Sequence, residues 1–375
     1  MKIKKHKALS PSLFFFLLLV PTSTFSFMYY PLTGAKVIGS DGYLAIPVAF
    51  LFTIPLLLIA TYFSYRYPGL TIIEYTPLVL GKFLGMVCNL LYLAVYFMLT
   101  VILLRDAIGL AYSFLLNRTP FFFINILMVG AALYLSYYGI SSTARLASFL
   151  LPAIVFLGLM IFLSYQNWQV INVLPLCKQP LYTYIRGGAL SLYVFYPLGL
   201  LFQAAAFTKR RKKIFSLSLL VLALVSGFYF LNFLGITGVF TAEGLTRYLW
   251  PNLEFVRTIS FPFALFDDVG LILLVAWGVL AYSSTTILFF FLAHGLSQLT
   301  LKPGNAQSVA SYQRILVVLG LITVATIQSI PNLDFLRARL NLFQIISGLI
   351  LFGLSFLLLL TSLTRRYFAR GKNNE

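Results

Sequence analysis

The chain has 375 residues, of which 60% are hydrophobic and only 10% are charged, and its formal net charge is +18. Water-soluble domains carry roughly 25% charged residues, so this composition excludes a soluble protein and indicates a polytopic membrane protein. The basic excess is then a signal of membrane topology and not of nucleic-acid binding.

Ten apolar stretches are long enough to cross a lipid bilayer as helices. The N-terminal apolar run continues to Pro31 without a small-residue cleavage site, so we expect a retained first span and not a cleaved signal peptide. Most of the 27 Lys and Arg residues, including the KRRKK cluster at 209–213, fall on one side, which predicts that both termini are cytoplasmic. The predicted spans are 12–33, 42–63, 83–116, 120–138, 144–164, 184–206, 214–238, 264–298, 312–330 and 342–363.

The first span contains a predicted break at VPTSTFSFMYYP, residues 20–31. Pro21 removes a backbone donor and clashes with the preceding turn, and nearby Ser and Thr hydroxyls can satisfy the backbone groups that are freed. Irregular backbone at membrane depth is tolerated only where it is buried in protein or lines a wet cavity. The break therefore predicts one wall of a binding site.

The sixth span, which opens the second half of the chain, carries Gly187, Gly188, Pro197 and Gly199 and is also predicted to be interrupted. Interrupted spans at corresponding positions of two halves are typical of transporter binding sites. The alternative is that these residues only kink membrane helices, where Gly and Pro are common.

The third span is too long for the bilayer core, so Arg105 and Asp106 are expected near its outer end. No acidic residue lies clearly at the centre of a span, which argues against a proton pump. The nearest candidates are Asp106 and the pair Asp267 and Asp268, for which an interfacial ion pair or a helix N-terminus is the alternative. A short helix is predicted within 67–82, and an outer helix is predicted at WPNLEFVRTI.

Hydroxyls and aromatic rings supply the remaining site candidates. The run from Ser283 to Thr286 in the eighth span is suited to coordinating an ion or ligand, or to bonding back to helix carbonyls. Aromatic side chains near the two interruptions would line a small apolar pocket, or else face lipid. Cys88 and Cys177 lie in different environments, and no disulfide, metal site, cofactor or catalytic set is expected.

The segments YPGLTIIEYTPLVLGKFLG and WPNLEFVRTI, with similarity over nearly the whole chain, resemble the spore germination permease family. This family comprises the B subunits of nutrient germinant receptors, within the amino acid–polyamine–organocation transporter superfamily. The resemblance implies an all-α fold like that of LeuT, with ten transmembrane helices in two inverted five-helix repeats, 12–164 and 184–363, and broken helices 1 and 6. The family's Gly-x-Gly falls on Thr24, Phe25 and Ser26 here, and Ser284 stands where relatives carry a basic residue.

The expected function is a non-enzymatic receptor subunit in the inner spore membrane. It would bind a small nutrient, with an amino acid as the expected class, and signal together with A and C subunits of the receptor. The alternatives are a secondary transporter of amino acids or similar solutes and a structural partner with an inactive site. The candidate ligand-binding residues are Thr22, Thr24, Phe25, Ser26, Tyr193, Phe195, Tyr196 and Ser284.

Overall fold

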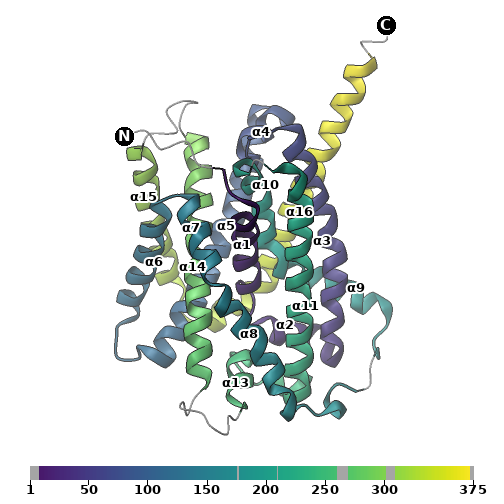
Figure 1. The fold of residues 1–375 in the computed structure, drawn as a ribbon, viewed down its shortest axis with the longest axis vertical. Helices are drawn as coiled ribbons and strands as arrows, with labels where there is room; N and C mark the ends of the chain where they lie inside the picture. Colours follow the sequence, from purple (N-terminus) through teal and green to yellow (C-terminus); the bar gives the residue numbers. More distant parts are fainter. Residues whose placement is uncertain (1–7, 175–176, 209, 260–268, 301–308, 372–375) are drawn as a thin grey trace.

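The computed structural model describes residues 8–174, 177–208, 210–259, 269–300 and 309–371, without the side chains of 309–311 and 367–371. This part of the chain is an all-helical bundle, as predicted (Figure 1). The long helices carry apolar residues all round because they face either the bundle interior or lipid. Asp267, Asp268, Lys209 and residues 1–7, on which part of the charge argument rests, lie outside the described residues.

The first half of the chain contains α1 to α8. The first predicted span appears as α1 and α2 with an interruption between them, and the third as α5 followed by a π-helical turn. The elements are α1 (Pro11–Thr24), α2 (Tyr30–Ile38), η1 (Gly39–Leu44), α3 (Ala45–Arg66), α4 (Ile72–Leu80), α5 (Lys82–Leu110), η2 (Ala111–Leu115), α6 (Phe121–Tyr137), α7 (Ile140–Phe149) and α8 (Leu151–Leu163).

The second half begins after a loop that contains two short 3-10 turns, η3 (Ser164–Asn167) and η4 (Val170–Asn172). Its last helix, α16, begins at Leu333, nine residues before the predicted span 342–363. The elements are α9 (Leu181–Ser191), η5 (Leu192–Leu200), α10 (Leu201–Ala204), η6 (Ala205–Phe207), η7 (Arg211–Lys213), α11 (Ile214–Phe240), α12 (Ala242–Leu245), α13 (Pro251–Arg257), α14 (Val269–Thr300), α15 (Val309–Ser329) and α16 (Leu333–Gly371).

Eight helical stretches in the described part are long and apolar enough to cross a membrane, and α1 and α6 are shorter apolar helices. One of the eight, Tyr30–Arg66, joins α2, η1 and α3, so the predicted total of ten spans stays a prediction. In the 18-residue apolar stretch of Leu181–Phe207, 78% is buried inside the bundle, whereas in the corresponding stretch of Ile140–Asn167 only 28% is buried. The sixth predicted span is therefore central, and α7 and α8 are peripheral.

Both predicted short helices are present. Helix α4 is capped by Thr71, whose backbone N–H donates to the Glu74 carboxylate at 2.8 Å while its hydroxyl donates to Gln298 of α14 at 2.7 Å. Helix α13 carries an ion pair between Arg257 and Glu254 at 3.3 Å. Figure 1 shows α4 and the C-terminal end of α16 at one end of the bundle and α13 at the other.

Arg105 and Asp106 differ from the expectation of an exposed interfacial pair. Their exposed fractions are 6% and 4%, and no ion pair joins them in the described part of the chain. The Arg105 guanidinium lies over the ring of Phe121 at 4.4 Å and donates to the Ile330 carbonyl at 3.5 Å. The position of Arg105 and Asp106 near the end of α5 does not leave their side chains exposed, because α6 and the segment before α16 cover this end of the helix.

Candidate ligand site at the interrupted first span

The first span is interrupted at residues 25–29, where the sequence predicts it. Pro21 lies inside α1 and has no N–H, and Pro31 at the start of α2 has none either. Phe27 donates its N–H to the Thr24 carbonyl, three residues back, at 3.3 Å. The Ser23 carbonyl thereby loses the donor that an α-helix would supply at residue 27, and the Phe27 carbonyl would need the N–H that Pro31 lacks.

Side chains from the second half of the chain bind these carbonyl groups. The Tyr229 hydroxyl of α11 donates to the Ser23 carbonyl at 3.1 Å, and the Trp277 indole of α14 donates to the Thr24 carbonyl at 3.3 Å. The Asn252 amide of α13 donates to the Phe27 carbonyl. All three donors are neutral and buried, so these three carbonyls are satisfied within the protein.

The hydroxyls of the candidate site in the first span also form hydrogen bonds within the protein. Thr22 donates to the Leu18 carbonyl and Thr24 to the Val20 carbonyl, each at 2.7 Å. Ser26 donates to the Tyr229 hydroxyl at 3.1 Å. The prediction that hydroxyls satisfy the carbonyls freed by the break is wrong for these three residues, because Thr22 and Thr24 bond within α1 and Ser26 bonds to a side chain.

The hydroxyl run in α14 bonds to its own helix. Ser284 donates to the Leu280 carbonyl and Thr285 to the Ala281 carbonyl, each at 2.8 Å. The Ser283 hydroxyl is buried and has no hydrogen-bond partner among the described residues. Of the two interpretations of this run, bonding back to the preceding turn is the one observed for Ser284 and Thr285.

The interruption of the sixth span appears as the 3-10 segment η5, between α9 and α10. The Tyr96 hydroxyl of α5 donates to the Tyr196 carbonyl and that of Tyr92 to the Gly199 carbonyl, each at 3.1 Å. Gly187 and Gly188 lie within α9 and do not interrupt it. A Cβ at Gly188 would lie 2.3 Å from Val48 Cγ1, so this glycine lets α9 approach α3 closely.

Aromatic rings from the two interrupted spans do meet. Tyr29 stacks on Tyr193 with ring centroids 5.8 Å apart, and the Thr33 and Tyr193 hydroxyls share a hydrogen bond. The predicted residues Phe25, Phe195 and Tyr196 are all buried, and the Tyr196 hydroxyl donates to the Gln344 carbonyl of α16. Tyr29, Thr33 and Tyr193 together form a layer beside the break, here called the tyrosine layer.

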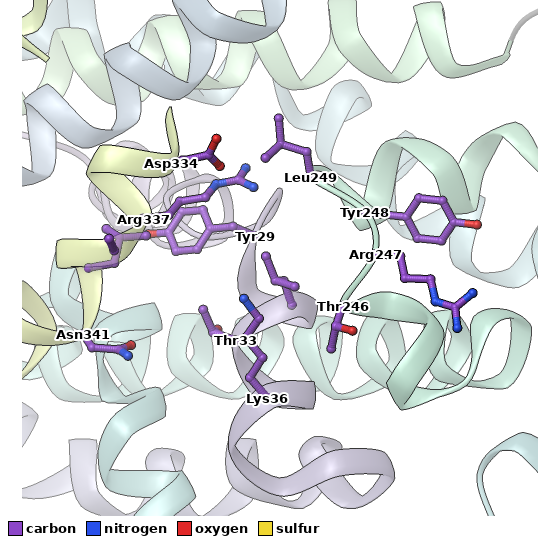
Figure 2. A pocket seen from close by; sticks show the side chains of 13 residues that line it. Tyr29, Thr33, Lys36, Thr246, Arg247, Tyr248, Leu249, Asp334, Arg337 and Asn341 are labelled. Atoms are coloured by element: carbon purple, nitrogen blue, oxygen red, sulfur yellow. The ribbon is translucent and has the colours of Figure 1, made fainter. Parts of the chain in front are cut away.

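A cavity of about 480 Å³ lies on the α2 side of this layer (Figure 2). Its walls come from α2, from the segment after α12 and from the start of α16. None of the eight predicted ligand-binding residues lines it. The polar lining residues are Tyr29, Thr33, Lys36, Thr246, Arg247, Tyr248, Asp334, Arg337 and Asn341.

The α16 contribution to this cavity was missed because the predicted tenth span began at residue 342. Asp334, Arg337 and Asn341 follow one another at helical spacing of three and four residues, so they lie on one face of α16. Extending the helix back to Leu333 would have revealed this polar stripe in the sequence. At the opposite side of the break, Leu9 donates its N–H to the Phe207 carbonyl at 2.8 Å, which ties the chain before α1 to the end of η6.

Comparison with known proteins gives the family. The family model described as "Spore germination protein" matches residues 8–335. The chain belongs to this family. Among curated relatives from Bacillus subtilis (strain 168), spore germination protein YndE is 25% identical over 70% of this chain and 72% of its own length. Spore germination protein A2 is 23% identical over 63% and 64%, and spore germination protein B2 is 23% identical over 66% and 67%.

Solved structures show the fold of this family member. MhsT in complex with L-phenylalanine matches with a TM-score of 0.68 and 15% identity, covering 90% of this chain and 87% of that chain. A Na⁺-coupled sialic acid symporter matches with a TM-score of 0.67 and 10% identity, covering 96% and 81%. The fold is therefore that of LeuT-type transporters, and the resemblance found in the sequence is confirmed.

Proposed function

We propose that this spore germination protein is the transporter-like B subunit of a nutrient germinant receptor. It binds a small nutrient, most simply an amino acid, and signals together with partner A and C subunits. The family match, the curated relatives A2 and B2 and the transporter fold support this proposal. The proposal includes the division into inverted repeats 12–164 and 184–363 and a ligand site at Thr22, Thr24, Phe25, Ser26, Tyr193, Phe195, Tyr196 and Ser284.

The observation that carries the proposal is the interrupted first span, held by neutral donors from elements far away in the chain. Tyr229, Asn252 and Trp277 bind backbone carbonyls of the break without any charged group. A ligand that competes for these carbonyls would loosen contacts to α11, α13 and α14 together. Such a coupling between ligand binding and helix packing is what a receptor subunit requires.

One observation favours the second candidate, a proton-coupled solute transporter. Asp106 is 4% exposed, forms no ion pair in the described part of the chain, and lies within electrostatic range of Tyr29 at the end of the break. A buried carboxylate in a membrane helix is a candidate proton carrier. An uptake assay with the purified protein in lipid vesicles distinguishes the two functions. Uphill amino-acid uptake supports the transporter if a protonophore abolishes it and if the Asp106→Asn variant lacks it.

The receptor proposal is tested by deleting the gene in the spore-forming organism that encodes it. Spores should lose germination with at least one single nutrient, and the intact gene should restore it. Unchanged germination across a full panel of amino acids and sugars would contradict the proposal.

We further propose that the protein lies in the inner spore membrane with both termini on the cytoplasmic side. A reporter active only in the cytoplasm should be active when fused after Lys213, in the basic cluster, and inactive when fused after Glu243, in α12. The reverse pattern would contradict this orientation.

A further inference from the structure

The cavity beside the tyrosine layer contains a buried cationic donor without an acceptor. Arg337 Nη2 is buried and has no hydrogen-bond partner among the described residues. An arginine carries five N–H donors and no acceptor, and leaving one unsatisfied in a buried position is costly. Arg337 itself lines the cavity wall, so a rotation of its guanidinium would bring this donor to a small molecule there.

A second buried donor lies next to Arg337. Trp250 Nε1 is buried and has no partner in the described ranges, and the Arg337 guanidinium lies 5.9 Å from the centre of the Trp250 ring. Trp250 is held in place by an edge-to-face contact with Phe114, at 5.6 Å between ring centroids. Trp250 does not line the cavity itself, so the missing acceptor next to the cavity is the one that Arg337 lacks.

The charges around the cavity favour an anion. Lys36, Arg247 and Arg337 line the cavity, against a single acid, Asp334. Figure 2 shows Lys36 extending from α2 toward the side where Tyr29 and Arg337 lie, whereas Arg247 extends away. Behind the wall, buried Asp106 interacts electrostatically with Arg337 first and with Arg105 second. With this pair of neighbours counted, four basic groups (Lys36, Arg247, Arg337 and Arg105) face two acids (Asp334 and Asp106), so a surplus of positive charge remains.

The same lining accommodates an ammonium group. The Asp334 carboxylate and the Asn341 amide lie on the same helix face as Arg337 and supply acceptors. A cavity of about 480 Å³ is within the usual size range of small-molecule sites. Polar groups of both signs with a net positive balance fit a zwitterion that carries an additional carboxylate.

We propose that the cavity beside the tyrosine layer is a binding site for acidic amino acids, with a carboxylate bound by Arg337 and Lys36. The inference rests on the proposed function only for its biological role, since binding itself is measurable without germination. None of the eight residues predicted at the interrupted spans lines this site, although Tyr193 contacts the lining residues Tyr29 and Thr33, and the ligand reaches the site from the α2 side of the break. Arg337 supplies directional hydrogen bonds, and Lys36 supplies a flexible point charge.

The test is calorimetric titration of the full-length protein in lipid nanodiscs with L-glutamate and with its neutral isostere L-glutamine. L-Glutamate should bind at least about tenfold more tightly, because a charge-assisted hydrogen bond is lost with the amide. Arg337→Gln should abolish this preference. Arg339→Gln is the matched control, because Arg339 lies one half-turn away, is exposed and does not line the cavity, so the preference should persist.

Lys36→Gln is a second variant, and it should not disturb folding because Lys36 is exposed. It should reduce the preference for L-glutamate over L-glutamine several-fold. Equal binding of the two ligands, no binding of either up to about 10 mM, or an unchanged preference in Arg337→Gln and Lys36→Gln would overturn the inference. Germination assays separate this result from the proposed function. If the gene deletion abolishes nutrient germination but the purified protein shows no preference for L-glutamate, the receptor proposal stands and the proposal of an acidic ligand is rejected.

Discussion

The first and sixth spans are both interrupted, but their backbone carbonyls are hydrogen-bonded in different ways. In the first, residues 25–29 leave the helix, and the carbonyls of Ser23 and Phe27 depend on Tyr229 and Asn252. In the sixth, η5 keeps a continuous 3-10 helix, so the hydroxyl of Tyr96 adds a bond to a carbonyl that already lies within a helix. The first span therefore depends on distant side chains for its shape, and the sixth depends on them much less.

This difference separates a candidate moving part from a fixed one. Near the first break, neutral and reversible hydrogen bonds connect the end of α1 and the break itself to α11, α13 and α14. Around the sixth span, close packing dominates: a Cβ at Gly188 would lie 2.3 Å from Val48 Cγ1 of α3, and one at Gly199 would lie 2.2 Å from the Tyr96 hydroxyl. Packed interfaces of this kind resist small displacements. A ligand-driven change is therefore expected to begin at the first break.

The largest expected effect is that of Asn252→Leu. The leucine leaves the Phe27 carbonyl without its side-chain donor and the Asn232 amide without its acceptor, both in a buried site. Each unsatisfied group costs about 1–3 kcal/mol, so the free energy of unfolding should fall by roughly 2–6 kcal/mol. Denaturant unfolding of the purified protein in mixed micelles measures it. Asn117→Leu, at an exposed turn, is the control, and equal losses in the two variants would show that the break does not need the amide.

Tyr229→Phe tests the same break with a smaller change. The ring stays, but the Ser23 carbonyl loses its donor and the Ser26 hydroxyl loses its acceptor. We expect a loss of about 1–3 kcal/mol, because the Ser26 hydroxyl can rotate toward another acceptor but the carbonyl cannot. Tyr182→Phe, at a side chain that is 69% exposed, is the control and should change the free energy of unfolding by less than about 0.5 kcal/mol.

Tyr96→Phe makes the matching change at the sixth span. It removes the hydroxyl that donates to the Tyr196 carbonyl, which lies within η5. The expected loss is about 0.5–1.5 kcal/mol, the usual net contribution of one hydrogen bond. The same micelle unfolding assay, run beside Tyr229→Phe, decides the comparison. A cost equal to or above that of Tyr229→Phe would mean that the sixth span depends on distant donors as much as the first.

The sequence located the break because its causes are local. Pro21, Pro31 and the hydroxyls between them lie within one short stretch, and the structure interrupts the helix there. The helical content and the short helices α4 and α13 were predicted for similar reasons, whereas the transporter fold was implied by the family resemblance. The donors that bind the break were not predictable in this way, because Tyr229 lies 206 residues from Ser23 and no local pattern connects them.

The cavity was missed for a different reason. Its cationic wall begins with α16 at Leu333, and hydropathy alone placed the last span later because Asp334, Arg337 and Arg339 lower the apolar average. Burial of Asp106 was missed because it depends on which helices cover the C-terminal end of α5. Charge near a span end indicates an interface only when no neighbouring element packs over it.

The smallest expected effect on stability, and the sharpest test of the predicted ligand site, is Thr24→Val. The Thr24 hydroxyl donates to the Val20 carbonyl inside its own helix, so an isosteric valine should change the free energy of unfolding by less than about 0.5 kcal/mol. A hydroxyl that donates in this way still has lone pairs that accept a hydrogen bond from a ligand. Loss of that bond should raise the nutrient concentration for half-maximal germination by up to about tenfold, which corresponds to ~1.4 kcal/mol. Thr53→Val is the matched control, because Thr53 makes the same bond to the Ala49 carbonyl in α3, away from the break. If both variants germinate like the unaltered protein at equal protein level, the Thr24 hydroxyl belongs to the helix alone. In that case the ligand does not contact the first break through this hydroxyl, and the ligand site must be sought on the α2 side of the tyrosine layer.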